Sequence, residues 1–186
     1  MPRYLLRHAT PLIDTALCYG RLNVPAHRGH TQAAAIAAAS ILQDPHITLM
    51  CSPLLRCQQL GQALQTTLQA HGQQTTWHTV PSLQEMHFGV WEGQPWSQVT
   101  PAEWRAWMQH FTHYRAGTTG ESVLALLERV YHLWQQPVQG TEVWITHAGV
   151  IRAVQLFEQG YQPQHLIKAK QWPQTSCGYG QWHLCQ

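Results

Sequence analysis

The chain has 186 residues, of which 44% are hydrophobic and 11% charged, and its formal net charge at pH 7 is +2. This length fits a single globular domain over residues 1–186 with a sizeable core. The small net charge gives no support for binding to nucleic acid or to an anionic membrane, and no apolar run is long enough to span a bilayer. We therefore expect neither kind of partner.

The cysteine and histidine patterns give no support for a metal site or a disulfide framework. The five cysteines are odd in number and include no C-x-x-C pair. The thirteen histidines include no H-E-x-x-H motif, and we interpret His110 and His113 as part of a solvated helix face. The N-terminus lacks the plan of a signal peptide. These features predict a cytoplasmic protein that needs no metal and no cofactor.

Apolar patterns along the chain predict strands that alternate with helices. This alternation indicates an α/β fold with a mostly parallel, doubly wound sheet and helices on both faces. An edge strand is expected near the C-terminus, within residues 179–184. The expected strands lie near residues 3–7, 47–51, 75–80 and 142–146, and the expected helices at 31–42, 54–71, from 121 or 122 to about 134, and 150–157.

Two helix starts carry recognisable capping residues. Ser52 followed by Pro53 predicts an N-cap with proline at the first helical position. Thr100, Pro101 and Glu103 match a capping box, in which the glutamate side chain reaches back to the N-cap. The second of these helices lies in the segment 91–120, the least sheet-like part of the chain. We expect this segment to form a small helical cap or lid.

Residues suited to phosphate chemistry occur where predicted strands end. Arg7 and His8 lie where the first strand ends, and His147 follows the strand expected at 142–146. Carboxyl ends of parallel strands meet at one edge of a sheet, where ligands bind. Arg56 falls in the first turn of a helix, where the helix dipole disfavours a cation unless an anion is shared there. Glu85 lies in a loop with two glycines.

Two histidines, two arginines and a carboxylic acid can together carry out phosphoryl transfer. A neutral imidazole is a competent nucleophile towards phosphorus if an acceptor holds its other nitrogen. Arginine forks bind phosphoryl oxygens and stay charged at any working pH. A carboxylic acid can protonate the leaving alkoxide. This scheme requires no metal, and it predicts a small-molecule phosphate ester as the partner.

The chain resembles the histidine phosphatase superfamily, the phosphoglycerate-mutase-like phosphatases, over nearly its whole length. Four motifs in order carry the resemblance: Leu6-Arg7-His8-Ala9-Thr10, Ser52-Pro53-Leu54-Leu55-Arg56, Glu85 with Phe88-Gly89-Val90-Trp91-Glu92-Gly93, and Thr146-His147-Ala148-Gly149-Val150. The resemblance implies that His8 is phosphorylated and that Glu85 donates the proton. It also implies that Arg7, Arg56 and His147 hold the phosphate.

Further residues in or beside these motifs are expected to contact the substrate, namely Thr10, Arg21 and Ala148. For Arg21, pairing with an acidic neighbour is an equal alternative. Ala9 stands where the family usually has glycine, which bears on how closely the backbone approaches the phosphate. Glu85 is favoured as the acid over Glu92 in the same loop and over Glu121.

One branch of the superfamily, the α-ribazole phosphatases of cobalamin biosynthesis, resembles the chain in finer features. These are the stretches 18–22, 91–96 and 120–123. The resemblance implies α-ribazole 5′-phosphate as the substrate. A broad-specificity phosphatase or mutase of the same fold, and an inactive phospho-ligand-binding protein, are the alternatives. A homodimer is left open.

Several tryptophans lie near the expected cap. Trp104 and Trp107 are expected to pack in its core. For Trp91 and Trp96 the sequence favours equally a place in the core and a place in an aromatic wall for a heterocyclic substrate.

Overall fold

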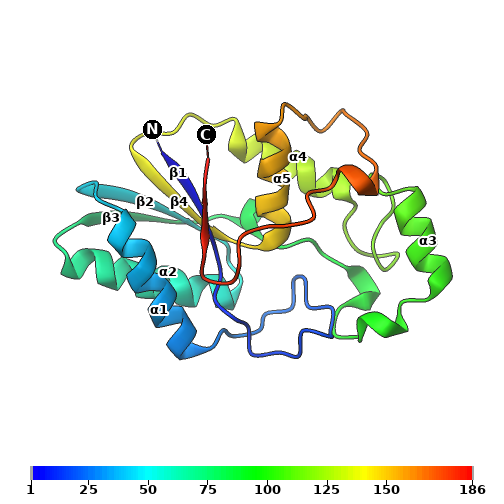
Figure 1. Ribbon diagram of the computed structural model, residues 1–186, viewed down its shortest axis with the longest axis horizontal. Coiled ribbons are helices and arrows are strands. Elements are labelled where there is room, and N and C mark those ends of the chain that lie inside the picture. Colours follow the sequence, from blue (N-terminus) through cyan, green and yellow to red (C-terminus); the bar gives the residue numbers. More distant parts are fainter. Residues whose placement is uncertain (1, 186) are drawn as a thin grey trace.

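A five-stranded sheet organises the computed structural model, which describes residues 2–185 (Figure 1). The strand order is β3-β2-β4-β1-β5. The first four strands of the sequence run parallel, and β5 pairs antiparallel with β1 at one edge. The predicted α/β fold and the C-terminal edge strand are thus confirmed. The strands are β1 (Arg3–Arg7), β2 (His46–Cys51), β3 (Gln74–Thr79), β4 (Thr141–Thr146) and β5 (Trp182–Leu184).

Helices cover both faces of this sheet, α1 and α2 on one and α4 and α5 on the other (Figure 1). Alternate strand residues point to opposite faces, so Leu5 joins the hydrophobic cluster with α4 and α5, whereas Leu6 joins the cluster with α1 and α2. Each face of the sheet therefore has its own core. The helices are α1 (Arg28–Ile41), α2 (Leu55–Ala70), α3 (Pro101–Gln109), α4 (Val123–Trp134) and α5 (Ala148–Glu158).

The two predicted helix caps have different outcomes. At the start of α3, Thr100 Oγ1 accepts from the backbone N–H of Glu103 at 3.2 Å, and Glu103 Oε2 accepts from that of Thr100 at 2.9 Å. The capping box is therefore confirmed. The N-cap predicted at Ser52 is wrong, because α2 begins at Leu55 and Leu54 is its N-cap residue. The backbone of Ser52 still hydrogen-bonds to β4, and its hydroxyl serves a different contact, described below.

The insertion between β3 and α4 contains α3 and short 3₁₀ turns at Pro81–Leu83, Gly89–Trp91 and Trp96–Gln98. In Figure 1, α3 lies at the end of the molecule opposite β3. Trp91, Trp107 and Phe111 bury their rings in the cluster that includes α4 and α5. Through these three rings, the segment 91–120 packs on the core that includes α4 and α5. Trp104 was expected in the core, but it is 45% exposed.

All five cysteines are free thiols. Burial raises the pKa of Cys18, Cys57 and Cys185 to about 12, so these thiols are neutral at pH 7. In the part of the chain that the structure describes, no helix is both long enough and apolar enough to cross a membrane.

The packing of α2 on β3 depends on a glycine. A Cβ at Gly61 would overlap the ring of Trp77. A helical Gly→Ala change normally stabilises by about 0.5–1 kcal/mol. We expect Gly61→Ala instead to lower the free energy of unfolding by about 1–3 kcal/mol through overpacking. Urea denaturation measures this. Gly29→Ala is the control, because its Cβ would meet only the ring of exposed His27; equal effects of both changes would contradict the packing argument.

Candidate active site

His8 lies directly after β1 and is 2% exposed. Its Nδ1 is 2.8 Å from the carbonyl oxygen of Ala9. Because a carbonyl only accepts, Nδ1 carries the proton of the neutral ring and Nε2 keeps its lone pair. Burial, with the positive charges of Arg56 and Arg7, holds the pKa of His8 well below its usual value. The ring is therefore neutral at pH 7 and has a free nucleophilic nitrogen.

Two arginines flank this histidine. Arg56, in the first turn of α2, is fully buried and donates to the carbonyl oxygens of Leu22 at 2.8 Å and Gly20 at 2.7 Å. Arg7, the last residue of β1, donates to the carbonyl oxygen of Cys177 at 3.0 Å. These contacts anchor part of each guanidinium. Within residues 2–185, the buried Nε of each arginine has no hydrogen-bond partner.

His147 follows β4 and is also fully buried. Its ring centroid is 5.1 Å from that of His8, and its Nε2 lies 2.9 Å from Ser52 Oγ. The Ser52 hydroxyl thus orients this histidine, which is the contact that replaces the predicted helix cap. Burial, with Arg56 as the first of several positive neighbours, lowers the pKa of His147 well below its usual value. Its Nδ1 has no partner in the described chain.

Three residues that follow or end β1, β2 and β4 carry unpaired nitrogen atoms, and each interacts with His8 through its charge or its ring. In the described chain, six buried side-chain polar atoms lack a partner, and three of them are Arg7 Nε, Arg56 Nε and His147 Nδ1. Buried donors are normally satisfied, because an unmade hydrogen bond costs about 1–3 kcal/mol. Two of the three groups are cationic. The arrangement therefore fits a bound anion with several oxygens next to His8.

Two tyrosines border the cavity of about 230 Å³ that Arg7 and His8 line. The hydroxyl groups of Tyr19 and Tyr179 are 2.8 Å apart, and the Arg7 guanidinium carbon lies 4.0 Å from the centre of the Tyr179 ring. The backbone N–H of Gly180 donates to the carbonyl oxygen of Arg7 at 3.1 Å, which holds this C-terminal turn against β1. Sequence reasoning missed Tyr179, whose neighbours carry no catalytic pattern.

Glu85 lies at the wall that the His8 cavity shares with a second cavity. Its carboxylate accepts from the backbone N–H of Met86 at 2.9 Å and of Gly149 at 3.2 Å. A Cβ at Gly149 would overlap Glu85 Oε1. Glycine at this position therefore allows the carboxylate to lie against the start of α5, beside the His8 cavity.

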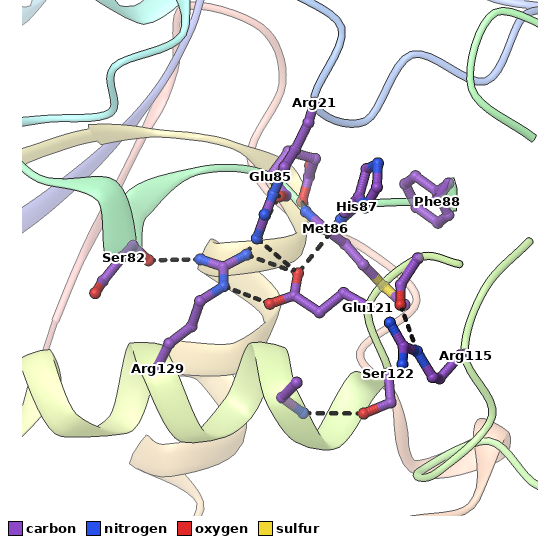
Figure 2. A network of polar contacts seen from close by, with 12 residues as sticks. Arg21, Ser82, Glu85, Met86, His87, Phe88, Arg115, Glu121, Ser122 and Arg129 are labelled. Carbon is purple, nitrogen blue, oxygen red and sulfur yellow. Dashed lines mark hydrogen bonds and ion pairs between the residues drawn. The ribbon is translucent and has the colours of Figure 1, made fainter. Parts of the chain in front are cut away.

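Glu121 is the centre of an ion-pair network, shown in Figure 2. It pairs with Arg129 at 2.7 Å and with Arg21 at 3.2 Å. Both arginines also donate to the backbone carbonyl oxygen of Glu85 at 3.2 Å (Figure 2). The network therefore fixes the backbone of Glu85 and leaves its carboxylate to the cavity.

The other candidate residues fall in different places. Ala148 lines the His8 cavity, whereas Arg21 and Thr10 are not among its lining residues. Arg21 pairs with Glu121, the alternative that the sequence left open, and Thr10 Oγ1 lies 3.0 Å from His30 Nδ1. Contact of Thr10 and Arg21 with the substrate stays a prediction.

Glu92, the alternative proton donor in the same loop as Glu85, instead binds two backbone N–H groups. Its Oε1 accepts from the backbone N–H groups of Arg21 at 2.8 Å and Phe88 at 2.9 Å. The replacement of glycine by Ala9 creates no backbone strain, because Thr118 is the only non-glycine residue with a positive φ in the described chain.

The two tryptophans that the sequence left open take different positions. Trp91 is buried in the core that includes α4 and α5. Trp96 lines the His8 cavity and meets Phe88 edge-on, at a centroid distance of 5.3 Å. An aromatic wall therefore borders the site at Trp96 but not at Trp91.

Comparison with known proteins shows the family to which the chain belongs. The sequence profile of the histidine phosphatase superfamily, branch 1, matches residues 3–181. The protein therefore belongs to this superfamily, whose members are typically phosphatases or mutases. No curated protein matches the chain.

Solved structures with the same fold include three from bacteria. A mycobacterial glucosyl-3-phosphoglycerate phosphatase is 21% identical, with a TM-score of 0.72 over 98% of this chain and 88% of its own. The TTHB049 protein of Thermus thermophilus is 24% identical, with a TM-score of 0.67 over 99% of this chain and 92% of its own. A phosphoglycerate mutase from the same organism is 26% identical, with a TM-score of 0.63 over 88% of this chain and 86% of its own.

The buried histidines make stability depend on pH. Their pKa values lie below 6.5 in the folded protein, so the unfolded chain binds more protons as the pH falls below that value. Stability is therefore full above about pH 7.5 and is lost towards pH 5. We expect His147→Gln to reduce this dependence by up to about 1.4 kcal/mol per pH unit, measured by urea denaturation. Exposed His71→Gln is the control, and an unchanged slope in His147→Gln would contradict the assignment.

Proposed function

We propose that the protein is a metal-independent phosphomonoesterase that works through a phosphohistidine at His8. The observation that carries the proposal is the set of unpaired nitrogens of Arg7, Arg56 and His147 around the neutral His8 ring. A phosphoryl group offers several charged oxygens to these donors and a phosphorus atom to Nε2.

The reaction follows from this arrangement in two steps. His8 Nε2 attacks phosphorus while the phosphorus–oxygen bond to the alcohol breaks, and Glu85 in its acid form gives a proton to the leaving oxygen. Water then attacks phosphorus and loses a proton to the Glu85 carboxylate. The phosphorus–nitrogen bond breaks, and its electron pair returns to Nε2. In both steps Arg7 and Arg56 stabilise the charge on the phosphoryl oxygens.

We assign the tautomer of His147 from its contact with Ser52. The Ser52 hydroxyl oxygen accepts from the backbone N–H of Leu54 at 3.4 Å, and the hydroxyl can donate its own proton to His147 Nε2. The neutral ring then carries its proton on Nδ1. This nitrogen becomes a neutral donor to the phosphoryl group, beside the two cationic arginines.

For the substrate we propose α-ribazole 5′-phosphate. Support comes from the motifs shared with that branch and from the aromatic cavity beyond Glu85. Phosphoglycerate mutase activity is the second candidate, because a mutase from Thermus thermophilus shares the fold at 26% identity. A mutase passes the phosphoryl group to a second substrate molecule, whereas a phosphatase passes it to water.

Phosphate release from α-ribazole 5′-phosphate, p-nitrophenyl phosphate and 3-phosphoglycerate in EDTA separates these candidates. We expect kcat/KM to be highest for α-ribazole 5′-phosphate by about a hundredfold, or about 2.7 kcal/mol of transition-state binding. Similar values for all three would indicate a broad-specificity phosphatase. Labelled phosphate that moves to phosphoglycerate instead of water would indicate a mutase. Binding of the esters without any phosphate release would indicate an inactive binding protein.

His8→Ala tests the nucleophile. We expect it to abolish turnover and the acid-labile phosphoenzyme, because the change removes the nitrogen that attacks phosphorus. Rapid quench with labelled substrate, alongside circular dichroism to verify folding, measures both. Retained turnover in a folded His8→Ala protein would disprove the mechanism.

Glu85→Gln tests the proposed proton donor, and Gly149→Ala tests the glycine that leaves room for its carboxylate. We expect Glu85→Gln to slow alkyl phosphates by about 10²–10⁴-fold and p-nitrophenyl phosphate far less, because nitrophenolate leaves without a proton. Gly149→Ala should push the carboxylate away and slow alkyl phosphates in the same selective way. If it acts through Glu85, the double variant should be little slower than Glu85→Gln alone. Fully additive losses would show that the glycine acts elsewhere.

A further inference from the structure

Three side chains that can bind a metal ion meet at the end of the sheet opposite His8. They are Glu158, His183 and Cys185, and one ligand atom of each lies within 4.8 Å of the other two. Glu158 is the last residue of α5, His183 lies in β5, and Cys185 follows that strand. Within residues 2–185, this is the single group of three or more Cys, His, Asp and Glu side chains that could share one ion.

The pairing of β5 with β1 determines where this group lies. His183 is opposite Leu5, and the backbone N–H of Cys185 donates to the carbonyl oxygen of Arg3 at 2.9 Å. Arg3 is the first residue of β1, and His8 follows the last. Because a strand rises by about 3.3 Å per residue, Arg3 and His8 are about 16 Å apart. The group is therefore separate from the candidate active site.

The local structure brings the three side chains to one face of the sheet. Residues two positions apart in a strand point to the same face, so His183 and Cys185 share a face. Leu5, which is opposite His183, belongs to the core with α4 and α5, and Cys185 packs against the same core. Glu158 reaches this face from the end of α5. No sequence motif indicates the group, because Glu158 and His183 are 25 positions apart.

The position of Glu158 favours a bound cation. The C-terminal end of a helix is the negative end of its dipole, so a carboxylate in the last turn is disfavoured unless a cation is near. Glu158 Oε2 is 2.8 Å from His183 Nε2, and the two side chains are 17% and 27% exposed. His183 compensates the carboxylate fully only when the ring is protonated. A divalent ion bound by the same two atoms would replace the proton between them with a larger positive charge.

The three donor atoms together select the kind of ion. Sulfur, imidazole nitrogen and carboxylate oxygen are the ligands of Zn²⁺, which binds four ligands in a tetrahedron at about 2.0–2.3 Å. Ca²⁺ and Mg²⁺ instead prefer oxygen ligands alone. Two ligands of a tetrahedral Zn²⁺ ion are about 3.3–3.8 Å apart. Separations of up to 4.8 Å reach this range through side-chain movements of about 1 Å.

We propose that Glu158, His183 and Cys185 form a structural Zn²⁺ site that joins β5 to α5, with water as the fourth ligand. On binding, the Cys185 thiol and His183 Nε2 give up their protons to solvent, because each must offer a lone pair to the metal. β5 has only three residues, so this joint would hold a short edge strand in place. The ion takes no part in phosphoryl transfer, and the inference does not rest on the proposed function.

Calorimetry with ZnCl₂ and absorption spectroscopy with CoCl₂ test the site in the whole chain, after EDTA has removed bound metal. We expect one Zn²⁺ ion per chain. We also expect Co²⁺ to give a thiolate charge-transfer band in the near ultraviolet. Surface histidines can bind both ions weakly, but they cannot produce this band, because it requires a sulfur ligand.

Variants that remove one ligand each test the assignment. Loss of an outer-shell partner alone weakens metal binding by about 10–100-fold, so Cys185→Ser, His183→Gln and Glu158→Gln should each weaken Zn²⁺ binding by at least about a hundredfold. Cys185→Ser should also abolish the Co²⁺ band. The controls are Cys177→Ser, a partly buried thiol in the same segment, and exposed His71→Gln, which should change neither measurement. Circular dichroism verifies that each variant is folded.

Two results would overturn the proposal without any appeal to the variants' stability. The first is the absence of a thiolate band when CoCl₂ is added to the unmodified protein, and the second is a band of equal strength in folded Cys185→Ser. Glu158 and His183 would then form an ion pair only. The measurements use no phosphate ester, so their outcome is independent of whether the protein is a phosphatase.

Discussion

The desolvation of positive charge around His8 is the constraint on which the rest of the site depends. Arg56 is fully buried, and its guanidinium is satisfied only in part, by the carbonyl oxygens of Gly20 and Leu22. A buried cation with an unpaired N–H is costly unless an anion arrives. Burial and, after it, the same charges lower the pKa of His8 and of His147. One arrangement therefore serves both parts of the proposed mechanism, the anion site and the neutral nucleophile.

Backbone carbonyl oxygens and close-packed glycines, rather than acidic side chains, hold Arg56 and Glu85 in position. Gly20 can lie close to the loop that begins at Glu85 because it lacks a Cβ, which would overlap the Met86 carbonyl oxygen. Gly149 allows the same close approach for Glu85. A carboxylate directly on Arg56 would satisfy it and remove its attraction for phosphate, whereas a carbonyl oxygen orients the guanidinium without neutralising it. The charge therefore stays available to the substrate.

The loop that begins at Glu85 is fixed by charged side chains that do not line the His8 cavity. Glu121 neutralises Arg21 and Arg129, and both arginines hold the Glu85 backbone (Figure 2). The loop is thus held through the main chain, while the Glu85 side chain lies at the wall between two cavities. In the proposed reaction, the phosphoryl group lies on the His8 side of Glu85 and the leaving group on the other side.

The sequence by itself determined the strands and the reactive residues at their ends. Buried strands are local apolar patterns, and the carboxyl ends of parallel strands converge, so His8, Arg56 and His147 could be expected to meet. Only the tertiary structure decided the contacts of Ser52, Arg21 and Tyr179. Ser52 reads locally as a helix cap, yet its hydroxyl faces a histidine 95 positions away. Tyr179 and the aromatic cavity come from segments that meet only when β5 and the insertion pack on the sheet, which no local pattern encodes.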